Sequence, residues 1–349
     1  MHIELKDPVY GLPAWQGEAP GIDDLTGTLK ELAQHGTAWR PIASGKRREI
    51  ITTWRSKVDN HIESISKTMS QATGLSSTQV QDDLDAWFHA DLTNTVTEQH
   101  DKPIWLLTDI ADLQILLPLT NYLLAGNTVM LLVPDFLYPG LDALQKLWPS
   151  DAGCQPLQVV VVDDPSQLEL QALPMAYLHF YGSIAGARLV HSRLAGRFEV
   201  PAKFEVLSNG ELKVDNELTD NDVKAMVKKA LHHSGQSVNN LKRIWVDSAI
   251  AVKLQQQLIA QMKKIRVAAF DAEPAPFISS LPSLQYSERA LVQYKQRVAH
   301  GAEALVPMRR LLGKSGMLTP GLLLLSAEQA KEDAEPIAGP VLELVLDDS

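Results

Sequence analysis

Short apolar segments that alternate with helical patterns constrain this chain most strongly. Strands that are apolar on both sides must be covered on both faces, as the strands of parallel sheets are. Right-handed crossovers between such strands build a doubly wound, Rossmann-like sheet. The predicted strands are 104–108, 128–133, 157–162 and 176–180, and the predicted helices among them are 110–124, 141–147 and 183–194. We therefore predict an α/β fold.

A second α/β unit is predicted to start near residue 200. Its expected strands are 204–207, 243–246, 321–325 and 341–346, and its expected helices are 219–233, 249–263 and 288–300. The 349 residues are enough for two domains, which we predict at 1–200 and 201–349. Residues 1–40 are expected to be irregular, and the apolar stripe over 44–69 predicts one long helix.

Charge and cysteine content exclude several classes of protein. The net charge is −10, and Lys46-Arg47-Arg48 is the one basic cluster, so we expect no nucleic-acid partner. The most apolar region, 104–134, is broken by charged residues, Pro and Gly, so we expect no membrane span. The chain starts without a signal-peptide pattern, so we expect a cytoplasmic protein. One cysteine, Cys154, excludes an intrachain disulfide and a cysteine-rich metal site.

Several separated motifs follow one another in a recognisable order. Gly235-Gln236 lies between a predicted helix and a predicted strand. The other motifs are Ala125-Gly126-Asn127-Thr128-Val129, Phe180-Tyr181-Gly182-Ser183, Lys203-Phe204-Glu205-Val206 and Glu335-Pro336-Ile337-Ala338-Gly339-Pro340-Val341. In this order and with these separations, the chain over about residues 44–349 resembles the aldehyde dehydrogenase superfamily. The resemblance implies two Rossmann-like domains and NAD or NADP as cofactor.

The resemblance also shows where the chain departs from the family. The catalytic cysteine of the family falls on Val238, and the asparagine that holds the oxyanion falls on Asp109. Glu205 keeps the carboxylate of the water-activating residue. Family members attack the aldehyde with a thiolate and then activate water with this glutamate. We therefore expect a degenerate catalytic site made of Glu205, Asp109 and Val238.

The expected cofactor site keeps some of the residues that the family uses and lacks others. The family's ribose-binding lysine falls on Leu132, whereas Asp135 keeps an acceptor for ribose hydroxyls. Gly182 and Ser183 keep the turn whose helix start faces a pyrophosphate in the family. The resemblance further implies that the oligomerisation hairpin, within residues 90–103, is shortened. We also expect the architecture to be truncated at the C-terminus, after the Gly339-Pro340-Val341 segment.

Each of these residues also has a structural interpretation. Val238 and Cys154 fit core packing, and Ser237 is a weak alternative nucleophile. His232 and His233 end a helix, where their charge favours its dipole, and no third metal ligand is evident, so we expect no metal. Asp109 either caps a helix or faces a ligand. Glu205 is either an ion-pair partner or a ligand contact.

The sequence leaves more than one function open. The first is a catalytically degenerate family member that binds a nucleotide, a metabolite or a protein partner. The second is an NAD(P)-dependent oxidoreductase that acts on an aldehyde or oxo group by an altered mechanism, with Glu205 or Asp109 as acid or base. The third is a scaffold role for the exposed surfaces.

Overall fold

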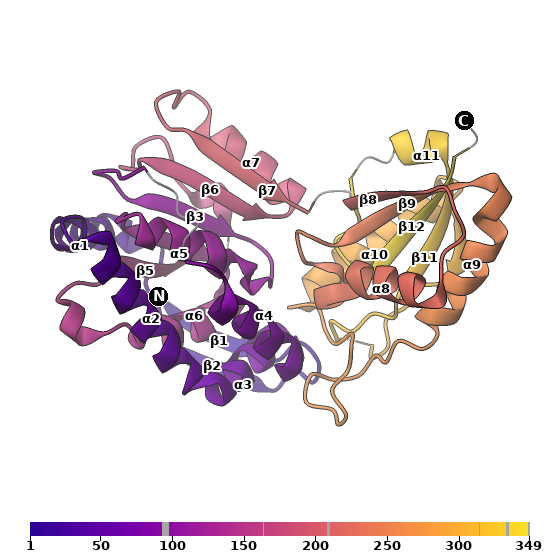
Figure 1. Ribbon diagram of the computed structural model, residues 1–349, viewed down its shortest axis with the longest axis horizontal. Coiled ribbons are helices and arrows are strands. Elements are labelled where there is room, and N and C mark those ends of the chain that lie inside the picture. Colours follow the sequence, from indigo (N-terminus) through magenta and orange to yellow (C-terminus); the bar gives the residue numbers. More distant parts are fainter. Residues whose placement is uncertain (93–97, 163, 208–209, 314, 333–334, 348–349) are drawn as a thin grey trace. The chain divides into compact units, whose positions relative to one another are not determined.

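The structure is a computed structural model that describes residues 1–92, 98–162, 164–207, 210–313, 315–332 and 335–347 (Figure 1). It divides into two compact units. The first unit holds Met1–Leu5, Pro13–Ala72 and Val80–Val206, and the second holds Lys6–Leu12, Thr73–Gln79 and Leu207–Ser349. Each unit carries its own five-stranded sheet, and each is described here by itself.

The sheet of the first unit is parallel throughout, which confirms the predicted doubly wound α/β fold. Its strands lie in the order β5-β4-β3-β6-β7. They are β3 (Ile104–Thr108), β4 (Val129–Val133), β5 (Leu157–Val161), β6 (Tyr177–Gly182) and β7 (Ala202–Val206). Strands β3 and β4 are buried at every residue, as their apolar sequences require. The residues of this unit that were expected to carry catalysis lie at a strand end, as Asp109 does, or on the edge strand β7, as Glu205 does.

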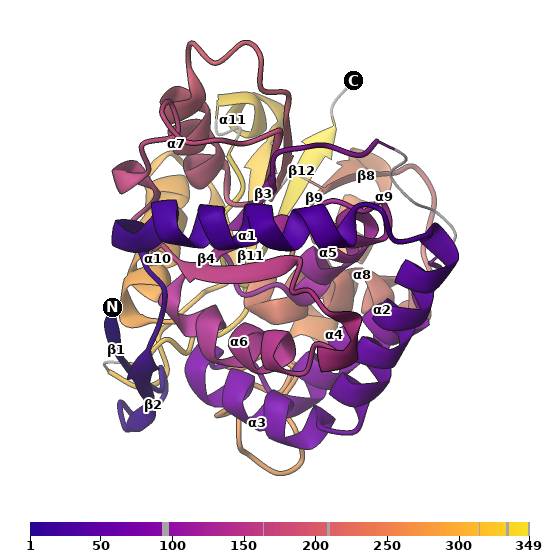
Figure 2. The same ribbon diagram turned by 90° about the vertical axis from the view of Figure 1, so that its left-hand side faces the viewer.

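Helices pack the first sheet through two groups of buried side chains. One group joins α1 (Leu25–Trp39) and α7 (Ile184–Leu194) to the strands (Figure 2). The other contains tryptophans in edge-to-face and tilted contact, in which the ring centroid of Trp54 lies 5.1 Å from that of Trp87 and 5.2 Å from that of Trp148. Helices α2 (Ser44–Asp59), α3 (Ile62–Thr73), α4 (Ser77–His89), α5 (Leu116–Leu124) and α6 (Tyr138–Lys146) complete this half of the chain, with a small sheet of β1 (His2–Lys6) and β2 (Pro13–Glu18).

The sheet of the second unit has the order β10-β11-β12-β9-β8. Only the edge strand β10 runs antiparallel to its neighbour. The strands are β8 (Gly210–Val214), β9 (Leu241–Asp247), β10 (Glu303–Val306), β11 (Gly321–Ser326) and β12 (Val341–Asp347). Helices α8 (Asp220–Leu231) and α9 (Ser248–Met262) share one apolar core with the sheet, and α10 (Leu284–Ala299) and α11 (Ala327–Glu332) share another.

Three local expectations are wrong. Residues 1–40 are not irregular, because α1 forms over Leu25–Trp39 and buries Leu25, Leu29 and Leu32 along one side. The helix predicted over 44–69 is divided in two, since α2 ends before Asn60 and α3 begins at Ile62. The strand expected to open the second unit is the edge strand β7 of the first sheet, where it pairs with β6.

The expected shortening of the oligomerisation hairpin concerns residues that the structure describes only in part. Residues 93–97, within the segment where a shortened hairpin is expected, lie outside the described residues. In the part of the chain that the structure describes, no helix has both the length and the apolar character needed to cross a membrane.

A buried group of charges fixes the centre of the second sheet. The carboxylate of Glu343 on β12 accepts hydrogen bonds from Arg243 of β9, with Nη2 at 2.7 Å and Nε at 3.0 Å. Its other oxygen accepts from Nε of Arg297 on α10 at 3.0 Å. The side chains of Arg243 and Glu343 are each 3% exposed. A carboxylate buried this deeply depends on its partners, because an unpaired buried charge is strongly destabilising.

We expect Glu343→Gln to lower the free energy of unfolding by about 3–5 kcal/mol, because it leaves two buried guanidinium groups facing a neutral amide. Urea unfolding of purified protein measures this loss. The matched control is Glu211→Gln, whose carboxylate also contacts Arg243, at 3.3 Å, but is 42% exposed. It should cost less than about 1 kcal/mol. Equal losses in the two variants would contradict this account of the buried cluster.

Candidate functional site

Asp109, the predicted degenerate oxyanion position, directly follows β3 and faces the first turn of α7. Its Oδ1 accepts a hydrogen bond from the backbone N–H of Ser183 at 2.7 Å, and its Oδ2 accepts one from the Ser183 hydroxyl. The Ser183 Oγ in turn accepts from the backbone N–H of Gly186 at 2.9 Å. The start of a helix carries a partial positive charge, so a carboxylate is stabilised there. Asp109 therefore helps to cap α7.

The glycines around Asp109 show how closely the carboxylate approaches the helix. A Cβ at Gly182 would collide with Asp109 Oδ1, and one at Gly186 would collide with Oδ2. Both positions therefore need glycine as long as the carboxylate lies there. The structure thus brings Asp109, Gly182 and Ser183 into contact. The Gly182-Ser183 turn, predicted to face a cofactor, instead contacts the carboxylate of Asp109.

This arrangement does not fit the cofactor that the sequence resemblance implies. A pyrophosphate needs backbone N–H donors and positive potential at the helix start. Here the Ser183 N–H already donates to a carboxylate, whose charge repels a second anion. Leu132, at the position of the ribose-binding lysine, is 1% exposed within β4. Asp135 accepts a hydrogen bond from the backbone N–H of Phe136 at 2.7 Å. The predicted cofactor residues Asp135, Gly182 and Ser183 therefore serve local structure in this conformation.

Glu205, the predicted water-activating residue, lies on β7 within an ion-pair group. Its Oε1 contacts the Lys203 ammonium and lies 3.1 Å from His179 Nε2 on β6. The other ring nitrogen of His179 is 3.0 Å from the Tyr122 hydroxyl. Burial raises the pKa of Glu205, but Lys203 and His179 outweigh it and hold the pKa below its ordinary value. Burial lowers the pKa of His179 to about 4, against the opposing effect of Glu205.

Glu205 is therefore an ionised ion-pair partner at neutral pH. General bases work best when their pKa lies near the working pH, and this carboxylate is shifted away from that range. Its side chain is nonetheless 35% exposed, so a ligand could still reach it. Strand β6 separates β3, which precedes Asp109, from β7, which carries Glu205.

The loop that carries Val238 connects α8 to β9 in the second unit. His233 and Ser234 adopt left-handed backbone conformations, with φ of 48° and 54°. Such conformations cost on the order of 1–3 kcal/mol each in residues other than glycine. Gly235 has φ of 80°, and a Cβ there would collide with the carbonyl of Gly339. Val238 is 8% exposed and carries no atom able to attack a carbonyl.

Lys242 holds this strained loop in place. It is 2% exposed, and its Nζ donates to the carbonyls of Gly235 at 2.5 Å, Ile337 at 3.2 Å and Gly339 at 3.1 Å. Three acceptors match the three donors of an ammonium group. Burial lowers the pKa of Lys242 to about 7, and the nearby Glu343 carboxylate opposes this shift. The lysine joins two of the sequence motifs, Gly235-Gln236 and the segment 335–341, through backbone carbonyls.

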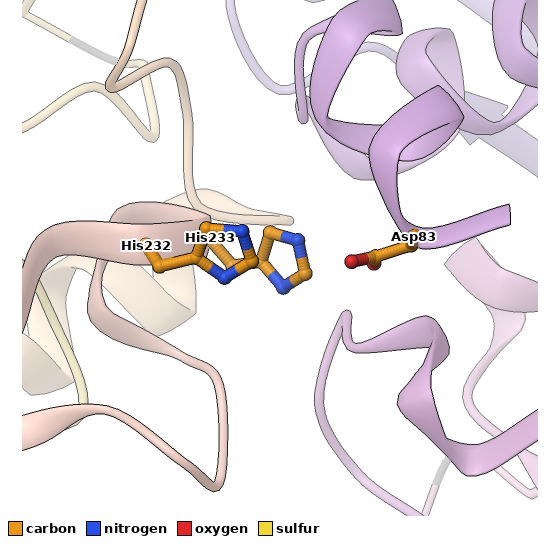
Figure 3. A group of neighbouring side chains, drawn as sticks. All are labelled: Asp83, His232 and His233. Carbon is orange, nitrogen blue, oxygen red and sulfur yellow. The ribbon is translucent and has the colours of Figure 1, made fainter. Parts of the chain in front are cut away.

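Two histidines lie side by side at the end of α8 (Figure 3). The ring centroids of His232 and His233 are 3.9 Å apart with an interplanar angle of 30°. Asn240 Nδ2 donates to the carbonyl of His232 at 2.9 Å and so ties the loop back to the helix end. The third residue drawn in Figure 3, Asp83, belongs to α4 in the first unit.

The two other candidate nucleophiles are buried. Ser237 is 1% exposed, and its hydroxyl oxygen accepts a hydrogen bond from the backbone N–H of Asn239 at 3.4 Å. Cys154 is 8% exposed in the first unit, and burial raises the pKa of its thiol. A raised pKa leaves less of the reactive thiolate at neutral pH. Neither side chain has the environment of an activated nucleophile.

The sequence analysis missed the parts of the site that support it. Lys242 and Arg243 interrupt the apolar strand β9, and both are buried. Two adjacent charges inside a strand of a covered parallel sheet are an unusual pattern, because each needs a partner in the core. That pattern could have singled out both residues, although their partners at 337–343 could not be read from it.

Family, sequence and structure comparisons all match this chain to aldehyde dehydrogenases. A model described as the aldehyde dehydrogenase family matches residues 118–347, more than half of the chain. An N-succinylglutamate 5-semialdehyde dehydrogenase of Klebsiella pneumoniae is 25% identical, over 97% of this chain and 74% of that protein. Its counterpart in Pseudomonas fluorescens is 24% identical, over 98% and 75%. A salicylaldehyde dehydrogenase structure from Pseudomonas putida G7 aligns with a TM-score of 0.85 at 15% identity, covering 100% of this chain and 78% of that one.

We expect Asp109→Ala to lower the free energy of unfolding by about 0.5–2 kcal/mol, since α7 loses a capping carboxylate. Added sulfate should then restore stability in the variant more than it stabilises the wild type, because an anion can take the vacated helix start. Thermal unfolding with and without sulfate, at matched ionic strength, measures both effects.

The matched control for this variant is Asp164→Ala. Asp164 also caps a short helix in the first unit, where its Oδ1 accepts from the Ser166 N–H at 2.8 Å. Sulfate should rescue this control no more than it stabilises the wild type. Equal rescue of the two variants, or of neither, would mean that the start of α7 is not an anion site held by Asp109.

Proposed function

Because the chain belongs to the aldehyde dehydrogenase family, we propose that it is a catalytically degenerate member that binds a nucleotide, metabolite or protein partner. The single observation that carries this proposal is Val238 at the position of the catalytic cysteine. Covalent catalysis needs a nucleophilic atom that forms and then releases a bond to the substrate. The valine side chain holds only carbon and hydrogen, so no thioester intermediate can form at this position.

The surroundings of Val238 support the same interpretation. The loop that would present a nucleophile is held by three hydrogen bonds from a buried lysine, and the nearest hydroxyl, Ser237, is buried. Loss of a nucleophile lowers kcat on the order of 10⁶-fold in enzymes that use a covalent intermediate. Other residues of the chain would have to supply that factor, and Glu205 is engaged by Lys203 and His179.

The carboxylate of Asp109 adds a second argument. A tetrahedral intermediate needs donors at its oxyanion, and a carboxylate offers acceptors. In this structure both carboxylate oxygens accept hydrogen bonds from Ser183, and the negative charge lies at the start of α7. Asp109 therefore disfavours both an oxyanion and a dinucleotide pyrophosphate. Among the proposed ligands, a metabolite or a protein is favoured over a dinucleotide.

A second candidate function keeps redox chemistry by another route. Hydride would pass directly between a bound substrate and a nicotinamide, with Glu205 moving the proton. The partial exposure of the Glu205 carboxylate and its contact with His179 favour this alternative. The same ion pair disfavours it, because it holds the pKa of Glu205 below the range of an effective base at neutral pH.

Aldehyde oxidation by the purified protein tests the proposal. The assay follows absorbance of reduced cofactor with NAD or NADP and with N-succinylglutamate 5-semialdehyde, salicylaldehyde, benzaldehyde and lactaldehyde, which are the aldehydes in the names of similar proteins. We expect no turnover above a protein-free blank. Turnover within a few orders of magnitude of ordinary enzymes, about 1–10³ per second, would refute the proposal.

A variant separates the two candidate functions if turnover is found. Glu205→Gln keeps the size of the side chain and one acceptor oxygen but removes its charge. Turnover that falls at least a hundredfold in this variant, the usual range for a general base, would establish the second candidate. Turnover that is unchanged in Glu205→Gln would exclude Glu205 from the reaction.

A further inference from the structure

A cavity of about 630 Å³ lies in the second unit, away from the residues discussed so far. It is bordered by the exposed side of α8, by the end of α9 and by the segment that follows α9 as far as Phe277. Cavities that take small ligands are roughly 300–1,000 Å³, so this one is large enough. None of the predicted catalytic or cofactor residues lines it, so a ligand here deepens the proposed binding function without resting on the loss of the nucleophile.

Four of the five charged residues that line this cavity are positive. Lys224 and Lys228 come from α8, and Lys264 and Arg266 from the segment after α9. Among the described residues, the three lysines have no ion-pair partner. Other lysines of the same unit do, since Lys213 lies 3.0 Å from Asp347. In a chain of net charge −10, four cations around one cavity are a local reversal of charge.

The helix dipole does not account for this cluster. Cations near the end of a helix are stabilised by its dipole, which explains Lys228 in the last turn of α8. It does not explain Lys224, in the middle of the helix, or Lys264 and Arg266, which come from another segment. Asp220 is the one carboxylate among the lining residues, and it accepts a hydrogen bond from Gln257 at 3.0 Å.

Two of the cations are held in position by the cavity wall. Arg266 donates from Nη2 to the carbonyl of Glu273 at 3.1 Å and from Nη1 to the carbonyl of Pro274. The Lys228 ammonium lies 6.0 Å from the centre of the Phe277 ring, within the range of a cation–π contact. The fork of an arginine recognises carboxylates and phosphates alike, but Arg266 uses its fork on backbone carbonyls, so direct contact with an anion falls to the lysines. Ammonium groups suit phosphate, which they bind as point charges.

We propose that this cavity is a binding site for a small phosphorylated metabolite. Lys224, Lys228 and Lys264 contact the phosphate oxygens, and Arg266 adds positive potential while it holds the wall of the cavity. The ligand carries at least two negative charges, because three unpaired ammonium groups face one hydrogen-bonded carboxylate. The site belongs to the second unit alone and needs neither a nucleophile nor a nicotinamide.

Isothermal titration calorimetry of the full-length protein with pyrophosphate tests the site. Titrations are run without divalent cations, against a chloride baseline of matched ionic strength, with citrate as a carboxylate probe of similar charge. The double variant Lys224→Gln with Lys228→Gln removes half of the cations. Lys229→Gln is the matched control, because Lys229 lies on the same helix, is exposed and does not line the cavity.

We expect saturable binding of pyrophosphate, weakened at least tenfold in the double variant and changed less than twofold in Lys229→Gln. Absence of saturable binding to the wild type would overturn the proposal. Equal weakening in the control would overturn it too, because the anion would then be attracted by the surface charge in general and not by this cavity. Binding unchanged in the double variant would place the anion elsewhere, and tighter binding of citrate would exclude a phosphate site. Circular dichroism confirms that the variants are folded.

Discussion

Burial of the central strands of each sheet is the constraint on which the rest of this structure depends. Strands β3 and β4 are buried along their whole length, so a polar side chain associated with them lies where the strand ends. Asp109 follows β3 at such an end, and a carboxylate there must find hydrogen-bond donors. The first turn of α7 supplies them through Ser183. The negative charge of Asp109 at this helix start disfavours a second anion such as a pyrophosphate.

In the second unit, too, the loop at the proposed catalytic position is held by structural contacts. The loop before β9 keeps the left-handed backbone of His233 and Ser234 and the close approach of Gly235 to Gly339. These features are costly, and proteins keep them where the surrounding structure compensates. Lys242 provides that compensation through three carbonyls. The loop is thus stabilised around a residue, Val238, that cannot perform the covalent step.

Much of the fold could be predicted from the sequence, because apolar strands and amphipathic helices have distinct periods. The doubly wound architecture was predicted in this way, whereas the family was suggested by the order of the short motifs that resemble it. The helix over Leu25–Trp39 was missed, since its apolar positions are interspersed with glycine and polar residues. The placement of β7 was missed because one strand sequence suits either sheet, and only its pairing with β6 decides between them.

The candidate site was less accessible to sequence reasoning. Alignment of motifs located Asp109, Glu205 and Val238, and the structure shows what the side chains of the first two contact. The motifs alone could not show that Asp109 faces Ser183 or that Glu205 pairs with His179 and Lys203. Nor could they show that Lys242 reaches residues about a hundred positions away. These contacts join distant segments, so they depend on the tertiary fold. The lysines of the α8 cavity were likewise visible only as scattered surface charges.

Calorimetric titration of the wild-type protein with NAD, NADH, NADP and NADPH tests the central claim most directly. The claim is that Asp109 occupies the anion-binding start of α7, so the first unit no longer holds a dinucleotide through its pyrophosphate. We predict no saturable binding of any of the four at the start of α7, up to millimolar concentrations. Binding to the α8 cavity is recognised because it weakens at least tenfold in the Lys224→Gln, Lys228→Gln variant. Saturable binding that is as tight in that variant as in the wild type would contradict the account.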